Sequence, residues 1–351
     1  MDGLTIVTGG AGFLGSHLVD QLVADGRRVR VVERPGAAVD HLPDGVEVAR
    51  ADIRDARAVR DAMRGARRVF HLAANPNLWV RDRREFEAVN HHGTIHVLDA
   101  AIAERAERIV HVSTESILTC ARATGPIAED VVVTEADAVG PYCLSKLRAE
   151  REAMTRADAG HPVLIANPTM PVGPGDRGLS PPSRLIRDYL RGKIPAILDC
   201  TLNLVDARDT AEGLRRIEER GQPGKRYLLG GTNLTLAGLF ERLESLSGVR
   251  APKRRVPYRA ALAYAFFSEW WADYVSGRSP QATVTGVRLT RRTMHFDASR
   301  SLAELGLRVR PVEESLADAV AWLSPGEPPS EEISENFKIR RISLANVLKA
   351  D

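Results

Sequence analysis

The chain has 351 residues, of which 44% are hydrophobic and 27% are charged, and its formal net charge is +3. These values are typical of a globular protein with one large or two ordinary domains. The basic residues are scattered along the chain, so we expect no nucleic-acid partner. The cysteines lack the C-x-x-C spacing, which argues against a disulfide framework and predicts no metal site; they are Cys120, Cys143 and Cys200.

The first ten residues lead directly into an apolar, strand-like segment, without the basic start and long apolar stretch of a signal peptide. No apolar run reaches the ~18 residues that a membrane-spanning helix needs. The expected location is therefore the cytoplasm. A peripheral contact with the inner face of the membrane is an alternative raised by the segment 258–275.

The first 170 residues alternate β-branched segments with amphipathic stretches, which predicts strand–helix units and a parallel sheet. The predicted strands are 4–8, 29–32, 46–49, 68–72, 108–113 and 162–166, and the predicted helices are 13–25, 56–63, 93–104 and 142–157. Right-handed crossovers place the carboxyl ends of all these strands on one edge, where a ligand is expected. The predicted fold class is α/β, a doubly wound Rossmann domain over residues 1–167.

A cluster of prolines and glycines from Pro168 to Ser183 marks a change in pattern. We expect a smaller substrate-binding part over residues 168–325, with later segments returning to the first domain. The polar stretch 326–351 is predicted to be a loosely docked tail. The elements predicted in the second part are helices 183–191, 208–220 and 236–247, the last capped by Thr235, and strands 201–205 and 226–230.

Residues 8–15 read T-G-G-A-G-F-L-G and lie between a predicted strand and a predicted helix. In a dinucleotide-binding turn the first glycine permits the tight turn, the second lets the backbone approach the pyrophosphate, and the third lets helix and strand pack closely. The free N–H groups at the helix start attract phosphates. The predicted cofactor contacts here are Gly9, Gly12, Phe13, Leu14 and Gly15.

Glu33 ends the second predicted strand, eighteen residues after Gly15. A carboxylate at this distance accepts hydrogen bonds from the adenosine ribose and repels a 2′-phosphate, which favours NAD. Arg34 favours NADP instead, because a guanidinium can pair with a 2′-phosphate, and a solvated loop charge is an equal alternative. After the third strand, Asp52 is expected to accept from the adenine amino group while Ile53 packs on the ring. The alternative for Asp52 is a helix cap.

Tyr142 and Lys146 stand four residues apart in Y-C-L-S-K, which is one turn of a predicted helix. A cation beside a phenol favours the phenolate, so we expect a lowered tyrosine pKa and a role as acid or base toward a carbonyl or alcohol. Lys146 can also hold the nicotinamide ribose. Ser113 and Thr114 follow the fifth strand, where a hydroxyl can donate to the substrate oxygen.

Six motifs, in this order, resemble the extended short-chain dehydrogenase/reductase superfamily, which includes sugar-nucleotide epimerases, dehydratases and dihydroflavonol reductases. They are T-G-G-A-G-F-L-G, A-D-I-R-D, F-H-L-A-A, V-N-H-H-G-T, V-S-T and Y-C-L-S-K. The resemblance implies that Thr114 is the catalytic hydroxyl and that Asn90 braces the sheet near the active site, with a purely structural amide as the alternative. It also implies a homodimer. The expected cofactor wall consists of Leu72, Ala73, Ala74 and Pro168.

The chain from residue 1 to about 323 also resembles the bacterial hopanoid-associated sugar epimerase group, through motifs such as L-W-V-R-D at 78–82 and V-G-P-Y-C-L-S-K at 139–146. Sugar-nucleotide members of the superfamily carry an arginine that holds the substrate diphosphate. The matching positions here are Leu202 and Asn203. Without that guanidinium a diphosphate loses its best partner, which favours another class of substrate.

The segment 258–275 is apolar over most of its surface and contains Phe266, Phe267, Trp270 and Trp271. We expect it to belong to the domain core, and the alternatives are an apolar substrate funnel and a membrane-interface helix. Glu115 stands where sugar dehydratases have the first of two acidic residues, so it can bind substrate or transfer a proton. The expected substrate contacts are Glu115, Trp79 and Asn167.

These residues predict an NAD(P)-dependent oxidoreductase acting on a carbonyl or secondary alcohol of a bulky, lipid-like substrate, with Tyr142 as the acid or base. The alternative is a sugar or sugar-nucleotide epimerase or dehydratase that retains its NAD. A protein that binds a dinucleotide only to sense redox state is a third reading, which the intact Tyr142/Lys146 pair disfavours. Net consumption of NAD(P)H distinguishes the first function from the second.

Overall fold

A parallel sheet forms the centre of the computed structural model, which describes residues 3–119 and 125–324. Cys120 and the predicted tail 326–351 lie outside the described residues. Within them the sheet has seven strands in the order β3-β2-β1-β4-β5-β6-β9, and every neighbouring pair is parallel. The strand order reverses between β1 and β4, as in a doubly wound Rossmann fold. The predicted fold class is confirmed.

The strands of this sheet begin and end within two residues of the predicted positions. They are β1 (Leu4–Thr8), β2 (Val29–Glu33), β3 (Glu47–Arg50), β4 (Ala66–His71), β5 (Arg108–Val112), β6 (Val163–Pro168) and β9 (Arg226–Leu229). Successive side chains of a strand point to opposite faces. Ile6 and Val7 of β1, both fully buried, accordingly belong to the cores on the two faces of the sheet. Apolar residues in succession therefore fit a strand covered on both sides.

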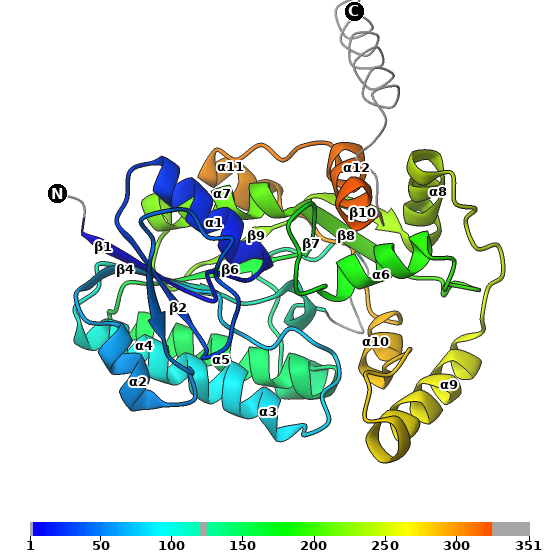
Figure 1. Ribbon diagram of the computed structural model, residues 1–351, viewed down its shortest axis with the longest axis horizontal. Coiled ribbons are helices and arrows are strands. Elements are labelled where there is room, and N and C mark those ends of the chain that lie inside the picture. The colour runs from blue at the N-terminus through cyan, green and yellow to red at the C-terminus, as the bar shows by residue number, and fades with distance from the viewer. Residues whose placement is uncertain (1–2, 120–124, 325–351) are drawn as a thin grey trace, which may run out of the picture.

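Helices cover both faces of the sheet (Figure 1). One face carries α1 (Phe13–Ala24), α7 (Ala207–Arg220) and α11 (Ser299–Leu305). The other carries α2 (Ala56–Ala62), α4 (Gly93–Ala103) and α5 (Gly140–Asp158). Two short turns, α3 (Arg84–Phe86) and the π-helical η1 (Glu87–His92), lead into α4. This arrangement leaves the carboxyl ends of the strands open for a ligand.

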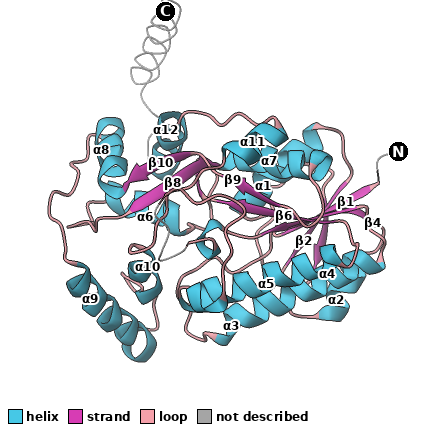
Figure 2. Cartoon of the chain, turned by 180° about the vertical axis from the view of Figure 1, so that it is seen from behind, coloured by secondary structure: helices cyan, strands magenta, loops and turns pink. Residues whose placement is uncertain are grey.

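A second, smaller sheet in the order β10-β8-β7 lies beside the first (Figure 2). Its strands are β7 (Met170–Val172), β8 (Thr201–Asp206) and β10 (Thr232–Thr235). It packs with α6 (Pro181–Leu190), α8 (Leu236–Ser247) and α12 (Val312–Leu323) around a core of its own. Because β9 lies between β8 and β10 in sequence but joins the large sheet, the chain passes between the two sheets more than once.

The segment 250–292 extends from the smaller sheet as an arm, formed by α9 (Tyr258–Trp271), the π-helical turn η4 (Ala272–Ser276) and α10 (Val284–Leu289) (Figure 1). The predicted core location of 258–275 is wrong. The buried residues of α9 and η4 are small, namely Ala265, Ser268 and Ala272. The bulky aromatic residues of the same helix are exposed instead. Among the described residues, no helix combines the length and apolar character needed to cross a membrane.

Candidate active site

The glycine loop after β1 approaches the end of β4 too closely for side chains. A Cβ on Gly9, whose φ is +70°, would lie 2.8 Å from the backbone nitrogen of Ala73, and a Cβ on Gly15 would lie 2.1 Å from the Gly9 oxygen. Helix α1 starts after Gly12 with no acidic residue in its first turn. Its free N–H groups and positive dipole end therefore suit a pyrophosphate, so these residues fit a dinucleotide.

The predicted adenosine contacts lie beside this loop. The backbone N–H of Ala11 donates to Glu33 Oε1 at 2.9 Å, which fixes the carboxylate next to the loop. Arg34 is exposed. Asp52 pairs with Arg54, and hydrogen bonding from this guanidinium lowers the Asp52 pKa.

The alternative interpretation of Asp52 as a helix cap is wrong, because the side chain of Asp55 accepts from the first N–H groups of α2. Ile53 is buried, and a Cβ on Gly93 would lie 2.7 Å from its side chain. The absence of a side chain at Gly93 therefore makes room for Ile53 beside α4.

The wall after β4 is held by hydrogen bonds to β1 and α5. The N–H of Ala73 donates to Thr8 Oγ1 at 3.2 Å, next to Leu72 and Ala74. Asn90 Oδ1 accepts from the N–H of Asn75 at 2.7 Å. Its Nδ2 donates to Ser145 Oγ at 3.1 Å. Asn90 therefore joins this wall to the helix that carries Tyr142 and Lys146.

Tyr142 and Lys146 lie on one face of α5 and are both buried. Lys146 Nζ donates to the Val112 carbonyl at 2.8 Å, and burial lowers the Lys146 pKa to about 8. The expectation of a lowered Tyr142 pKa is wrong. Burial, with the nearby Glu115 carboxyl and Cys143 thiol, raises the Tyr142 pKa above its usual value. Tyr142 therefore carries its proton at neutral pH.

Thr114 and Glu115, which follow β5, lie close to Tyr142. Thr114 Oγ1 donates to Glu115 Oε2 at 2.9 Å and lies 3.2 Å from Ser116 Oγ. The Thr114 hydroxyl beside the phenol opposes the rise of the Tyr142 pKa. Burial raises the Glu115 pKa to about 7. In the described part of the chain, the buried Ser113 hydroxyl has no hydrogen-bond partner.

Asn167 is buried and links the end of β5 to α5. Its Nδ2 donates to the Thr114 carbonyl at 3.2 Å and to Glu150 Oε2 at 2.7 Å. Arg226 of β9 donates to the other oxygen of Glu150 at 2.7 Å. The sequence prediction missed Glu150 and Arg226. Glu150 could have been found from its position one helical turn after Lys146.

Apolar side chains surround the Tyr142 ring. Phe86 meets it edge to face at 6.2 Å between ring centres. Val139 and Cys143 complete this buried cluster, and its partly buried neighbours are Leu78, Val80, Ala138 and Leu289. Trp79 is turned to the arm, because its indole N–H donates to Asp273 Oδ1 at 3.1 Å. Pro168 ends β6 on the same edge of the sheet.

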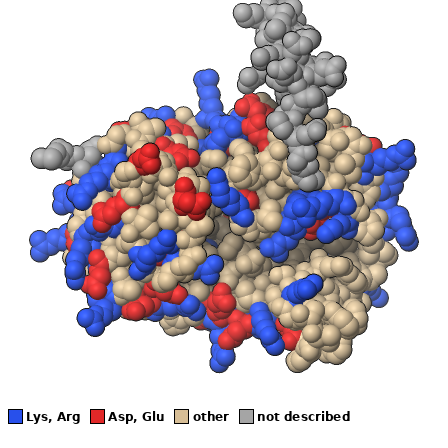
Figure 3. Space-filling view, viewed as in Figure 1, with Lys and Arg blue, Asp and Glu red and all other residues tan. Residues whose placement is uncertain are grey.

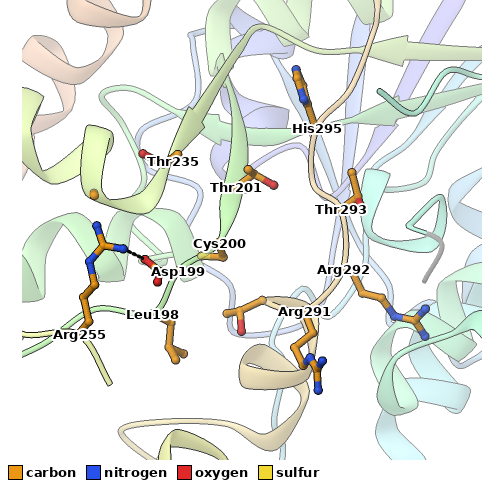
Figure 4. Close-up of a pocket in the computed structure, with 12 residues that line it drawn as sticks. Leu198, Asp199, Cys200, Thr201, Thr235, Arg255, Arg291, Arg292, Thr293 and His295 are labelled. Atoms are coloured by element: carbon orange, nitrogen blue, oxygen red, sulfur yellow. Dashed lines mark hydrogen bonds and ion pairs between the residues drawn. The ribbon is translucent and has the colours of Figure 1, made fainter. Parts of the chain in front are cut away.

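A cavity of about 490 Å³ opens beside the smaller sheet (Figure 4). Three guanidinium groups and one imidazole contribute to its lining, those of Arg255, Arg291, Arg292 and His295. Arg255 is paired with Asp199 at 2.6 Å. Asn203, at the position where sugar-nucleotide enzymes have arginine, instead accepts from the N–H of Gly231 at 2.9 Å. The arginines of this cavity lie in segments 255 and 291–292, outside the sequence motifs that resemble the superfamily.

Residues 5–230 match the sequence model of the "NAD dependent epimerase/dehydratase family". The chain belongs to this family. The NAD-dependent epimerase/dehydratase family uses NAD, and the glycine cradle and Glu33 fit that cofactor. The predicted membership of the extended short-chain dehydrogenase/reductase superfamily is confirmed, whereas the individual site residues and the homodimer stay predictions.

Two curated relatives and one solved structure match nearly the whole chain. "Sterol demethylase protein B" of Methylococcus capsulatus is 32% identical, over 91% of this chain and 97% of the relative. The "4-hydroxy-2-methyl-3-oxo-4-farnesyl-3,4-dihydroquinoline-1-oxide ketoreductase" of Stigmatella aurantiaca is 30% identical, over 92% and 96%. The crystal structure of gox2253 is 33% identical with a TM-score of 0.80, over 92% and 98%. The chain is thus similar along its length to family members with differing names.

Proposed function

We propose that the protein is an NAD-dependent reductase or dehydrogenase that acts on a carbonyl or secondary alcohol of a bulky, lipid-like substrate. The observation that carries this proposal is the buried Tyr142, whose hydroxyl keeps its proton beside Thr114 and whose ring lies among apolar side chains. An apolar substrate suits these surroundings because it loses little hydration on entering them. The ketoreductase relative, whose name describes a farnesylated substrate, supports the same class.

The proposed chemistry is a hydride transfer coupled to a proton transfer. When bound, NADH supplies a hydride to the carbonyl carbon. Tyr142 donates its proton to the carbonyl oxygen, so the C=O double bond becomes an alcohol. The Thr114 hydroxyl, which donates to Glu115 in the structure, would turn to donate to the same oxygen while negative charge develops there. Lys146, still mainly protonated at neutral pH, would hold the nicotinamide ribose and would stabilise the phenolate that remains after Tyr142 gives up its proton.

A panel of isoprenoid, sterol and long-chain ketones, offered with NADH, tests this proposal. We expect one class to be reduced with stoichiometric loss of NADH absorbance. Tyr142→Phe should lower kcat/KM by about 100-fold or more, because the proton donor is lost. Tyr227→Phe is the matched control, since the hydroxyl of this buried β9 residue accepts from the N–H of Gln222 in the loop before the strand, away from the site. Unchanged turnover in Tyr142→Phe would contradict the mechanism.

The second candidate is a sugar-nucleotide epimerase or dehydratase. Its support is the arginine-lined cavity, because guanidinium groups pair well with a diphosphate. Such an enzyme regenerates its NAD in each turnover. Isomerisation or dehydration of a UDP-sugar without net change in NADH, together with NAD retained through purification, would favour it over the reductase.

A further inference from the structure

The outer side of α9 and η4 presents a continuous row of large apolar residues to solvent. Adjacent pairs at 266/267, 270/271 and 274/275 repeat every four positions, which places them on one face of the helix. We call the whole row the aromatic face: Tyr264, Phe266, Phe267, Trp270, Trp271, Tyr274 and Val275. Trp270 is 51% exposed and Tyr274 is 78% exposed. The rings also contact one another, with 6.1 Å between the centres of Phe267 and Trp270 and 6.2 Å between those of Trp270 and Tyr274.

In an ordinary surface helix the large apolar side chains face the protein interior, whereas in α9 they face solvent. Its inner side, which packs on Val284 and Val287 of α10, is built from small residues such as Ala265. Burial of apolar surface stabilises a folded protein by ~25 cal/mol for each Å². The exposed side chains of α9 do not contribute this free energy to folding. A contiguous exposed apolar patch usually marks an interaction site. We therefore expect the aromatic face to be an interaction surface.

The charge around this face is strongly positive. Residues 250–292 contain nine basic and two acidic residues, a surplus of seven positive charges in a chain whose total is +3. The sequence predicted that basic residues are scattered along the chain, but in the arm they are concentrated. The two acids, Glu269 and Asp273, lie largely inward and pair with Arg83. In the part of the chain that the structure describes, Lys253, Arg254 and Arg259 form no ion pair.

Two basic residues contact aromatic rings of α9. The Arg288 guanidinium lies 5.9 Å from the centre of the Phe266 ring, which belongs to the aromatic face. The Arg291 guanidinium lies 4.9 Å from the ring centre of Tyr258, at the start of the helix and outside that face. Figure 3 shows an uncharged expanse over α9, with Lys and Arg side chains gathered beside it. Aromatic side chains between basic ones are typical of helices that lie in the headgroup region of an anionic bilayer.

We propose that the aromatic face, together with the basic residues of the arm, docks the protein onto an anionic lipid bilayer. A second copy of the chain fits less well, because it would bring two surfaces with the same positive surplus together. The arm would lie in the plane of the interface, with the aromatic rings at headgroup depth. The arm is tied through Asp273 to Trp79, and Leu289 of α10 belongs to the apolar surroundings of Tyr142. Docking would thus place the entrance to the site near the lipid, although the proposal does not depend on which substrate is used.

Co-sedimentation of the full chain with vesicles tests this proposal. We expect binding to phosphatidylcholine vesicles that contain phosphatidylglycerol, little binding to pure phosphatidylcholine, a loss of binding in high salt, and a blue shift of tryptophan fluorescence. The double variant Trp270→Ala/Trp271→Ala should bind at least about tenfold more weakly. Arg254→Glu/Arg259→Glu should lose the preference for phosphatidylglycerol.

Trp322→Ala is the matched control, because Trp322 is an exposed tryptophan on α12 outside the aromatic face. It should bind vesicles like the unaltered protein. The proposal is overturned if the unaltered protein ignores phosphatidylglycerol vesicles, or if the double tryptophan variant binds them equally well. It is also overturned if that variant changes only the oligomeric state, which would identify a self-association face. Because binding is the readout, a failed activity assay does not affect this test.

Discussion

At the scale of single residues, Glu115 is the group near Tyr142 whose charge changes around neutral pH, because burial raises its pKa to about 7. Below that pH it is neutral, and above it the carboxylate raises the Tyr142 pKa and makes the phenol a weaker acid. Reduction should therefore slow as the pH rises through about 7. Glu115→Gln should remove the decline of kcat/KM near pH 7. A second decline near pH 8, which we expect from deprotonation of Lys146, should remain. The measurement is kcat/KM for reduction between pH 6 and 9, and a retained decline near 7 in the variant would contradict the role.

His111 lies in β5, fully buried, and neither of its ring nitrogens has a hydrogen-bond partner in the described chain. Burial holds its pKa well below the usual value, so the unfolded chain binds a proton at a pH where the folded protein does not. Stability is therefore fully present above pH ~6.5 and falls below it, by up to about 1.4 kcal/mol for each pH unit. His111→Leu should remove the contribution of His111 to the loss of stability below pH ~6.5.

Urea denaturation at pH 7 and pH 5 measures the effect as a difference between the variant and the unaltered protein. That difference isolates His111 from His71, whose pKa burial lowers to about 3. His92→Gln, at an exposed position, should leave the pH dependence unchanged. Parallel losses of stability in His111→Leu and the unaltered protein would show that the buried imidazole is not responsible.

The pKa direction at Tyr142 is the part of the site that the sequence could not provide. The four-residue spacing predicts that Tyr142 and Lys146 share a helix face, which is correct. It does not show that Lys146 Nζ bonds the Val112 carbonyl, or that Glu115 and Cys143 face the phenol. Burial and neighbours from other strands decide a pKa, and these depend on tertiary contacts rather than on local pattern.

At the scale of elements, the loop between β1 and α1 depends on the absence of a side chain at Gly15. A Cβ there would lie 2.1 Å from the Gly9 carbonyl oxygen, so the loop backbone must move. Gly15→Ala should cost about 1–3 kcal/mol of stability and weaken NAD binding, because the N–H groups at the start of α1 shift with the loop. Calorimetric titration with NAD and thermal unfolding measure both effects.

The control for this loop is Gly178→Ala. Gly178 is exposed, and the nearest atom to its added Cβ is an Asp176 oxygen at 3.9 Å. That substitution should alter neither NAD affinity nor stability measurably. If Gly15→Ala binds NAD as tightly as the unaltered protein, the tight approach of the loop is not required for the cofactor.

The elements of the Rossmann part could be predicted from the sequence because each has a strong local period and a buried face. Strand β1 and helix α1 match the prediction almost residue for residue. The arm could not be placed in this way. The stripe of α9 indicates a helix correctly, but a hydrophobic period does not show whether the large or the small residues face inward. Only the contact of Ala265 with Val284 and Val287 decides it.

At the scale of the whole molecule, one cluster joins the arm to the cofactor domain. Arg83, which precedes α3, lies 3.1 Å from Asp273 and 3.5 Å from Glu269, and its guanidinium stacks 5.3 Å from the Trp79 ring centre. These groups are only partly exposed, so the pairs are screened less than surface pairs. Arg84, the next residue, is 91% exposed and pairs only with Asp82 among the described residues.

Arg83→Met should therefore loosen the arm while leaving the cofactor site intact. We expect a loss of about 1 kcal/mol in stability and faster backbone hydrogen exchange over residues 258–276, because the helix loses its charged tie to the rest of the protein. NAD affinity should not change, since among the described residues no hydrogen bond or ion pair links the glycine loop to this cluster. Arg84→Met should change neither the stability nor the hydrogen exchange over residues 258–276, because the Arg84–Asp82 ion pair is solvated. Equal exchange rates over 258–276 in the two variants would show that packing on α10, rather than the Arg83 cluster, holds the arm in place.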